Sequence, residues 1–273
     1  MDAKISVIIP CFNYSRYLMR SINSIRDQRS TDWELIVVDD GSTDSSRRLA
    51  QDFADDHPEL AVTLLFKRNG GLGRARNAGI SVARGEYIVC LDADDYFSDT
   101  ALEHMANKLD DDDSVDAVRP TLRAFGIADY TWSHSPYNFQ DLKSRNVAPY
   151  SSMFRRRAWV QVGGYNEMMP SYEDWDFWIA LGKLGGKMSS AAEALHYYRT
   201  SRDGMLAQHI HRDLELRATI VNNHPEVYDR YCRELASLVM AGEHIDDRLT
   251  ETRGGIFGES LRAYSLKRHQ DLS

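Results

Sequence analysis

The fold is decided by one short stretch, Tyr87-Ile88-Val89-Cys90-Leu91-Asp92-Ala93-Asp94-Asp95, in which an apolar run ends in three carboxylates. An apolar run of this length is typical of a buried central strand in a parallel sheet. Acidic groups at its carboxyl end would emerge where open α/β sheets bind ligands. Oxygen ligands suit a hard divalent cation, Mg²⁺ or Mn²⁺, that also contacts phosphate oxygens. An isolated Asp-x-Asp can equally be a polar loop that caps a strand, so the rest of the chain has to decide.

The composition is that of an ordinary globular chain. Its 273 residues are enough for one large domain or for one domain with an appendage. The formal net charge of -8 argues against a general nucleic-acid binder. The sequence contains no apolar run of bilayer length and no signal-peptide pattern, so we expect a cytoplasmic protein, with peripheral contact at the membrane face left open. The scattered cysteines, Cys11, Cys90 and Cys232, favour reduced thiols.

Segments with strand and helix patterns alternate through the first part of the chain. β-branched and apolar runs predict strands at 5–9, 35–38, 62–66 and 87–91, and helical spacing separates them. This alternation predicts an α/β fold with a mostly parallel twisted sheet flanked by helices. The strand at 35–38 also ends in acids, Asp39 and Asp40, so two strands bring carboxylates to the same edge of the sheet.

The third strand is followed by a glycine-rich segment, NGGLGRARNAG at 69–79. This segment comes close to a dinucleotide fingerprint, but Arg76 stands where the third glycine is needed and no glycine-rich turn follows the first strand. We therefore expect a loop that leads into a helix, with Arg76 free to reach an anion. Gly85 is expected to end that helix.

Two later segments also bear on function. Residues 120–150 lose periodicity and carry several aromatic side chains, which favours an insertion that shapes a pocket, or a set of short strands. Ser171 and Asp174 have the spacing of a capping box, and Glu173, Asp174 and Asp176 would lie in the first turn of the helix that follows. These acids either only favour the helix dipole or include a general base.

Beyond about residue 202 the sequence changes to charged amphipathic segments, with helices expected over about 206–223, 225–240 and 257–269. We therefore predict two units, a catalytic domain at 1–204 and a C-terminal helical extension at 205–273. The extension would pack on the main domain or on another subunit of a homo-oligomer.

Five blocks, taken together, resemble glycosyltransferase family 2. They are VIIPCFN at 7–13, VVDDGSTD at 37–44, the glycine-rich segment at 69–77, LDADD at 91–95 and EDWD at 173–176, and they span about the first 200 residues. The resemblance implies a GT-A fold, a nucleotide-diphosphate sugar as donor, a divalent cation (Mn²⁺ or Mg²⁺) and transfer with inversion. The acceptor would be a hydroxyl of a glycan, a lipid-linked glycan or another molecule, as in polysaccharide biosynthesis. UDP is the expected nucleotide by its frequency in the family.

The resemblance implies donor contacts for residues of the first three blocks. Pro10, Phe12 and Asn13 would contact the nucleoside, and Asp40 would hydrogen-bond the base. Arg76 corresponds to the family's arginine near the base and the phosphates.

The last two blocks would carry the metal and the chemistry. By the resemblance, Asp92 contacts the ribose or the metal's waters, Ala93 lies within the same donor-binding motif and Asp94 ligates the metal directly. Asp174 matches the catalytic base, with Glu173 beside it. A general base is needed because the pKa of an acceptor hydroxyl lies far above neutrality, and a single displacement needs no nucleophile from the enzyme.

The chain departs from the family where members often have a Tyr-Arg-x-His block. Here the sequence reads Tyr198-Arg199-Thr200-Ser201, without the histidine. Either Arg199 or Arg202 would then contact phosphate, or water or His196 would complete the metal shell. His196 is thus a candidate metal ligand, although a histidine in a strand is more often packed or hydrogen-bonded.

Two other functions remain open at this point. The first is a non-catalytic sugar-nucleotide-binding or assembly subunit that retains the fold, against which the intact Asp-x-Asp and Glu-Asp pairs argue. The second is a sugar nucleotidyltransferase, which usually has a glycine-rich loop directly after its first strand. The segment PCFNY at 10–14 has no glycine, so this reading is disfavoured.

Overall fold

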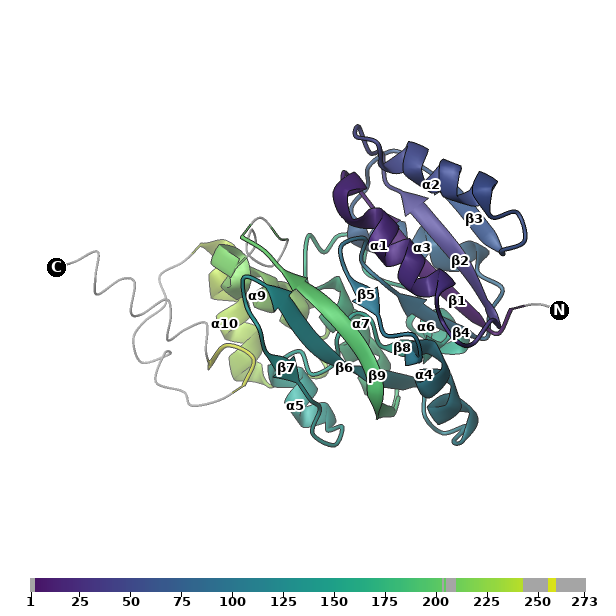
Figure 1. The fold of residues 1–273 in the computed structure, drawn as a ribbon. Helices are drawn as coiled ribbons and strands as arrows, with labels where there is room; N and C mark the ends of the chain where they lie inside the picture. Colours follow the sequence, from purple (N-terminus) through teal and green to yellow (C-terminus); the bar gives the residue numbers. More distant parts are fainter. Residues whose placement is uncertain (1–2, 203, 205–209, 243–254, 259–273) are drawn as a thin grey trace.

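The computed structural model describes residues 3–202, 204, 210–242 and 255–258. In this part of the chain the strands form one nine-stranded sheet of order β3-β2-β1-β4-β8-β6-β9-β5, and β7 pairs with β6 (Figure 1). The strands are β1 (Ile5–Cys11), β2 (Trp33–Asp39), β3 (Val62–Phe66), β4 (Tyr87–Cys90), β5 (Tyr96–Phe97), β6 (Ala117–Gly126), β7 (Thr131–Trp132), β8 (Met153–Arg155) and β9 (Met188–Thr200).

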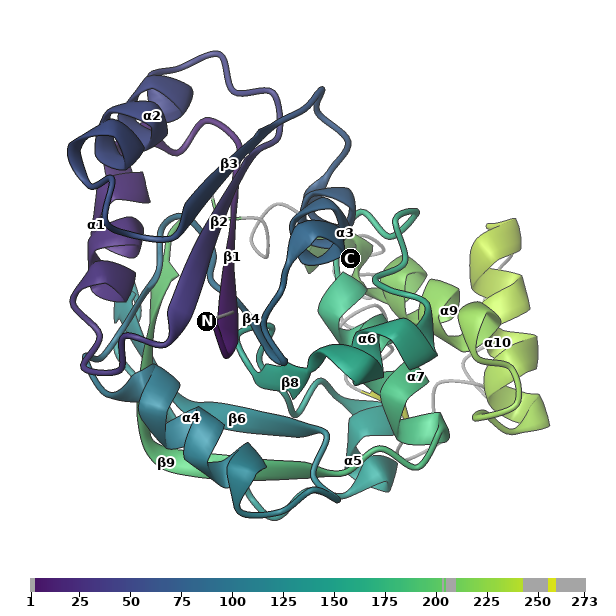
Figure 2. The same ribbon diagram turned by 90° about the vertical axis from the view of Figure 1, so that its right-hand side faces the viewer.

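The sheet is mostly parallel, as the sequence predicts. β3, β2, β1 and β4 run parallel to one another, and β6 and β9 form a second parallel pair. The short strand β8 joins the two groups by antiparallel pairing, and β5 pairs antiparallel with the end of β9. Figure 2 shows that the sheet curls between β3 and β9. The predicted α/β class is confirmed.

Helices cover both faces of the sheet (Figure 2). Alternate residues of β1 enter different cores: Val7 and Ile9 pack with one set of helices, and Ile8 packs with the other. The first set is α1 (Ser15–Arg26), α2 (Ser46–Asp56) and α4 (Ala101–Asp110). The second set is α3 (Leu72–Val82), α5 (Phe139–Ser144), α6 (Arg156–Val162), α7 (Glu173–Lys183), α9 (Asp213–Asn223) and α10 (Arg230–Ala241).

Two glycines allow close approach to β1. A Cβ on Gly79 would lie 2.5 Å from Cγ2 of Ile8, so a side chain there would push α3 off the sheet. Gly85 does not end α3 as expected, because that helix already ends at Val82. A Cβ on Gly85 would lie 2.7 Å from the backbone nitrogen of Ser6, so the glycine lets the chain pass next to β1 on its way into β4.

β1 extends past the point where the sequence places its end. We expected Pro10 to stop the strand, but the strand continues to Cys11. Beyond Ile8, β1 pairs with β2 and no longer with β4. Pro10 therefore lies where the strand has a neighbour on one side, and a missing N–H is tolerated at such a position.

The segment at 120–150 is more regular than an insertion. β6 runs through Pro120 to Gly126 and pairs with β9 along its whole length, with a register shift between Pro120 and Thr121. A proline at such an irregularity does not break the strand. The two-residue strand β7 and the helix α5 follow, so the segment differs from the expected set of short strands in having one long strand and a helix.

The C-terminal helices pack on the main body of the chain. Ala218, Ile220 and Val221 of α9 share one core with Trp175 and Trp178 of α7. The helix expected over 257–269 lies outside the described residues except at its start. No helix in the described part of the chain combines the length and the hydropathy that a bilayer crossing requires.

Candidate active site

The three acids after β4 have different environments. Asp92 accepts a hydrogen bond from Nη2 of Arg76 at 2.9 Å, whereas Asp95 is fully buried. Burial raises the pKa of Asp92, against the opposing charge of Arg76. The side chain of Ala93 is buried in the core, which leaves only its backbone free to contact a nucleotide. Asp92 and Asp94 are therefore the acids of this loop that could contact a ligand, whereas Asp95 anchors the loop.

Asp95 belongs to a buried hydrogen-bonded network. Its Oδ2 accepts from the hydroxyl of Tyr150 and lies 3.0 Å from Nε2 of His196, and its Oδ1 accepts from the backbone N–H of Arg199 at 2.6 Å. Nδ1 of His196 lies 2.9 Å from Oγ of Ser151. With its proton on Nε2, His196 donates to Asp95 and accepts from Ser151. Both ring nitrogens are thus engaged within the protein, so the structure does not favour His196 as a metal ligand.

Asp94 is the least neutralised acid of this loop. Burial and the nearby charges of Asp95 and Asp92 raise its pKa to about 8, and Arg199 opposes the shift. No group of three His, Cys, Asp or Glu side chains in the described residues is arranged to hold a metal ion. A divalent cation that bridges phosphates often takes only one or two carboxylates from the protein and fills its shell with water and phosphate oxygens. Asp94, with Asp92 nearby, fits that kind of partial site.

Arg76 joins the acidic loop to α7. Its guanidinium donates to Asp92 from Nη2 and to Oε1 of Glu173 from Nη1, at 2.9 and 2.5 Å, and it lies over the rings of Tyr150 and Tyr165. The side chain is 1% exposed. The sequence predicts that Arg76 is free to reach an external anion. In the structure the anions that Arg76 binds are instead two carboxylates of the chain itself.

α7 presents Glu173 and Asp174 in its first turn. Asp174 accepts from Nδ2 of Asn146 at 2.9 Å and remains partly accessible, whereas Glu173 is buried against Arg76. Burial raises the pKa of both carboxyls, that of Glu173 to about 7, and Arg76 opposes both shifts. Asp174 is therefore the acid that could reach an external hydroxyl.

The capping box predicted for this helix is wrong. α7 begins at Glu173, and no side chain caps it by a hydrogen bond. Its N-cap is Tyr172, which has a φ of 64° and lies in the left-handed region. A non-glycine residue in that region is strained by roughly 1 kcal/mol or more, and such strain persists only where surrounding contacts impose it.

Asp40 is also engaged inside the chain. Its carboxylate accepts from the backbone N–H groups of Gly70 and Gly71, and from Nζ of Lys67. These contacts hold the glycine-rich segment against the end of β2. An Asp40 that hydrogen-bonds a nucleotide base would have to share its oxygens with these donors.

The loop after β1 is tied to the loop after β2. Asn13, which also has a positive φ of 60°, accepts at Oδ1 from the backbone N–H of Thr43 at 2.8 Å, and its own N–H donates to Oγ of Ser42 at 3.0 Å. Phe12 is 43% exposed, whereas Pro10 is buried in β1. Of the three residues expected to contact the nucleoside, Phe12 is the one with an exposed ring.

Arg199 lies beside the acidic loop. Its guanidinium packs over the rings of Tyr17 and Phe125, with Cζ at 4.0 and 5.0 Å from the ring centroids, and Arg20 lies over the same Phe125 ring at 5.1 Å. Nε of Arg199 is buried without a hydrogen-bond partner. The side chain is thus held near Asp94 by aromatic contacts, with hydrogen-bonding capacity left over.

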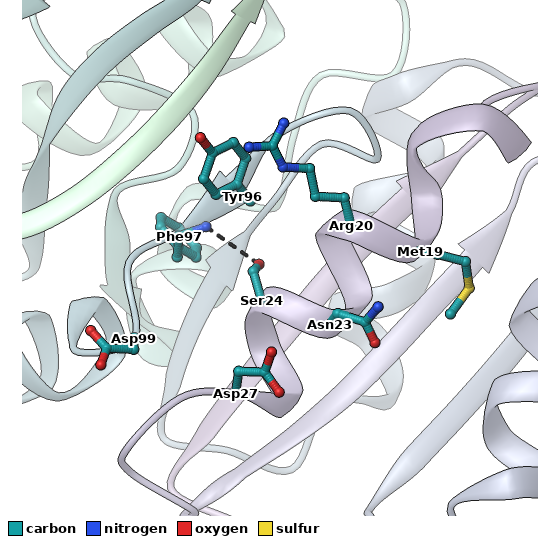
Figure 3. A pocket seen from close by; sticks show the side chains of 8 residues that line it. All are labelled: Met19, Arg20, Asn23, Ser24, Asp27, Tyr96, Phe97 and Asp99. Carbon is teal, nitrogen blue, oxygen red and sulfur yellow. Dashed lines mark hydrogen bonds between the residues drawn. The ribbon is translucent and has the colours of Figure 1, made fainter.

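A groove of about 520 Å³ runs along the flank of α1 next to β5. Figure 3 shows Arg20 beside Tyr96, and the backbone N–H of Phe97 donating to Oγ of Ser24. The lining residues are Met19, Arg20, Asn23, Ser24, Asp27, Tyr96, Phe97 and Asp99. None of the predicted site residues lines this groove.

Sequence reasoning missed several supporting residues. Lys67, Asn146 and Tyr150 hold Asp40, Asp174 and Asp95 respectively. The only available signal was for Tyr150, which belongs to the aromatic set of the 120–150 segment. Asn146 and Lys67 carry no local pattern that marks them.

Comparison with known proteins identifies relatives of the chain. Residues 6–163 match the family model described as Glycosyl transferase family 2. The chain is 31% identical over 185 residues to the chondroitin synthase of Escherichia coli, and this match covers 66% of the chain and 27% of the synthase. The chain therefore spans only about a quarter of that relative's length.

Two solved structures share the fold. TarS of S. aureus in complex with UDP-GlcNAc gives a TM-score of 0.65 at 20% identity, over 81% of this chain and 72% of that one. The mannosyltransferase PcManGT from Pyrobaculum calidifontis in complex with GDP-Man and Mn²⁺ gives a TM-score of 0.65 at 18% identity, over 98% and 80%. These likenesses establish the architecture in which the carboxylate cluster lies.

Proposed function

The chain belongs to glycosyl transferase family 2 and has the GT-A fold, and from this premise we propose that it transfers a sugar by a single inverting displacement. The donor would be a nucleotide-diphosphate sugar, and the acceptor a hydroxyl of a glycan or of another molecule. One observation carries this proposal: Arg76 bonds both to the acidic loop and to the first turn of α7. It holds a donor-side carboxylate and the candidate base helix at one site.

We propose that Asp94, with Asp92, holds a Mn²⁺ or Mg²⁺ ion. The support is that burial and the nearby charges of Asp95 and Asp92 raise the pKa of Asp94 to about 8, since an adjacent cation would relieve this repulsion. When held by Asp94 and Asp92, such an ion would stabilise the negative charge that develops on the leaving diphosphate. The chain's own contribution is to fix the loop, through the bonds of Asp95 to Tyr150, His196 and Arg199.

The base in this proposal is Asp174. The carboxylate of Glu173 is occupied by Arg76, whereas Asp174 has a single amide donor, Asn146. Asp174 would accept the proton of the acceptor hydroxyl as that oxygen attacks the anomeric carbon from the face opposite the diphosphate. Arg199, whose charge opposes the raised pKa of Asp94, would contact a phosphate oxygen of the donor.

We propose a UDP-sugar as the donor. TarS is solved with UDP-GlcNAc and PcManGT with GDP-Man, so related folds accept either base. The exposed ring of Phe12 and the loop tied together by Asn13 would form the nucleoside edge of the site. Asp40 would hold the glycine-rich segment in place and would also hydrogen-bond the nucleotide base.

A thermal-shift screen tests the donor half of the proposal. UDP-, GDP-, dTDP- and CDP-sugars are added with and without Mn²⁺, because a bound donor stabilises the folded chain by RT ln(1 + [L]/Kd). We expect a rise in Tm for a UDP-sugar with Mn²⁺. Asp94→Asn, which keeps the size of the side chain, should abolish the Mn²⁺-dependent part of the rise. The proposal is wrong if Asp94→Asn retains the full shift.

A further inference from the structure

The first turn of α7 is held from outside that helix. Tyr172 and Asn13 are the two non-glycine residues with positive φ in the described chain, and Tyr172 directly precedes Glu173 and Asp174. Because no side chain caps α7 by a hydrogen bond, the direction of this turn depends on what holds Tyr172. A rotation at Tyr172 would redirect both carboxylates that follow it.

Tyr172 is held by α9. Its hydroxyl donates to Oδ1 of Asp213 at 2.6 Å, and Nε of Arg217 donates to both oxygens of Asp213 at 2.9 Å. The guanidinium of Arg217 lies over the ring of Trp175, with Cζ 5.0 Å from the centroid. The contacts Tyr172–Asp213–Arg217–Trp175 thus leave the first turn of α7, pass through α9 and return to that turn. We call these four residues the α7 latch.

The latch is shielded and reinforced. The side chains of Asp213 and Arg217 are 17% and 13% exposed, so their ion pair is weakly screened by solvent. Arg217 also donates to the backbone oxygen of Ile256 at 2.7 Å. A second attachment follows along α7, where Oδ1 of Asp176 lies 2.8 Å from Nδ2 of Asn223 and 3.0 Å from Nε2 of His224. Attachment at two points prevents α7 from turning relative to α9.

We propose that Tyr172 and Asp213 are positioning residues for Asp174, and that α9 is therefore part of the transfer apparatus. The inference rests on the proposed function of Asp174 as the base. α7 and α9 both lie beyond residues 6–163, the region that matches the family model. The latch acts on the geometry of proton transfer, because its contacts hold the first turn of α7, which carries Asp174.

The test compares Tyr172→Phe with a matched control, Tyr228→Phe. Each change removes one hydroxyl and keeps the ring. The hydroxyl of Tyr228 donates to the backbone oxygen of Lys143 on α5, so the control loses a similar bond in the same C-terminal region, but one that does not hold Tyr172. The measurements are kcat and donor KM for transfer or donor hydrolysis, and amide hydrogen exchange across residues 173–176.

We expect Tyr172→Phe to lower kcat by about tenfold or more, since a small misplacement of a catalytic group has effects of this order. Its donor KM should stay within about twofold, and exchange at 173–176 should be faster. Asp213→Ala should show the same kcat loss, with no further loss in the double variant, because the two residues act as a unit. Tyr228→Phe should keep kcat within about twofold and leave exchange at 173–176 unchanged.

Two outcomes would overturn the inference: an unchanged kcat in Tyr172→Phe, or equal losses in Tyr172→Phe and Tyr228→Phe, which would indicate general loosening. If the wild-type chain neither transfers nor hydrolyses any donor, the proposed function fails. The exchange rates at 173–176 then still decide whether the latch holds this turn, since they do not depend on catalysis.

Discussion

Replacing Arg76 with methionine removes the charge that joins the acidic loop to α7. Arg76→Met keeps an unbranched chain of similar bulk among the rings of Tyr150 and Tyr165. It leaves the carboxylates of Asp92 and Glu173 without their guanidinium partner. We expect a large loss in the free energy of unfolding, most of it due to one of the two acids.

The size of the loss follows from exposure. The side chain of Asp92 is 26% exposed and can take up water, whereas that of Glu173 is 5% exposed and cannot. Breaking a buried pair by removing one partner typically costs about 3–5 kcal/mol, because an uncompensated charge stays buried. The buried carboxylate of Glu173 should account for most of this loss in the free energy of unfolding. In a Glu173→Gln background no such charge remains, so Arg76→Met should cost clearly less there.

The assay is urea unfolding at pH 7.5, followed by two spectroscopic probes to check two-state behaviour. Arg48→Met is the control, since Arg48 pairs with Asp52 on the exposed face of α2 at side-chain exposures of 68% and 53%. The control should change the free energy of unfolding by less than about 0.5 kcal/mol. A loss below about 1 kcal/mol for Arg76→Met, or an equal loss in the Glu173→Gln background, would refute the reasoning.

Two further predictions concern pH. The rate of transfer should fall as pH drops through the apparent pKa of the Glu173–Asp174 pair. Burial raises the pKa of both carboxyls above the ordinary value near 4, and that of Glu173 to about 7. An ascending limb of kcat centred near pH 4 would contradict this prediction. Burial raises the pKa of Asp44, but hydrogen bonds from Ser46 and Ser15 outweigh it and lower the pKa to about 2. This exposed carboxylate therefore stabilises the fold at pH values above its pKa in the unfolded chain, near 4. The stabilisation is lost as pH falls toward 2. Asp44→Ala should therefore cost about 1 kcal/mol at pH 7 in chemical unfolding, and the difference from wild type should vanish near pH 2; a pH-independent difference would count against it.

Local patterns predict the strands that build the site. The apolar runs that become β1 to β4 are recognisable because a central parallel strand is buried on both faces, and the acids after β2 and β4 then fall at one edge. These features depend on residues that are neighbours in the sequence.

The remaining features depend on contacts between distant residues. Arg76 meets Glu173 across 97 positions, and His196 meets Asp95 across 101, so no local pattern shows that either side chain is buried and satisfied. The spacing of Ser171 and Asp174 predicts a capping box with Ser171 as N-cap, but the N-cap is Tyr172, one residue later, and the hydroxyl of Tyr172 bonds to the distant Asp213. The strand β6 is hidden in the sequence by Pro120, which lies at the register shift in the pairing of β6 with β9.

We propose that Asp174 is the base of a glycosyl transfer whose donor is held at Asp94. The direct test is acceptor-dependent release of nucleoside diphosphate from a UDP-sugar with Mn²⁺, using a panel of oligosaccharides and glycan extracts, for wild type and Asp174→Asn. Asp174→Asn keeps the side-chain shape and removes the proton acceptor. We predict release by the wild type only when acceptor is present, a loss of at least about 100-fold in the variant, and an unchanged donor-induced rise in Tm. Undiminished release by a folded Asp174→Asn would contradict the account.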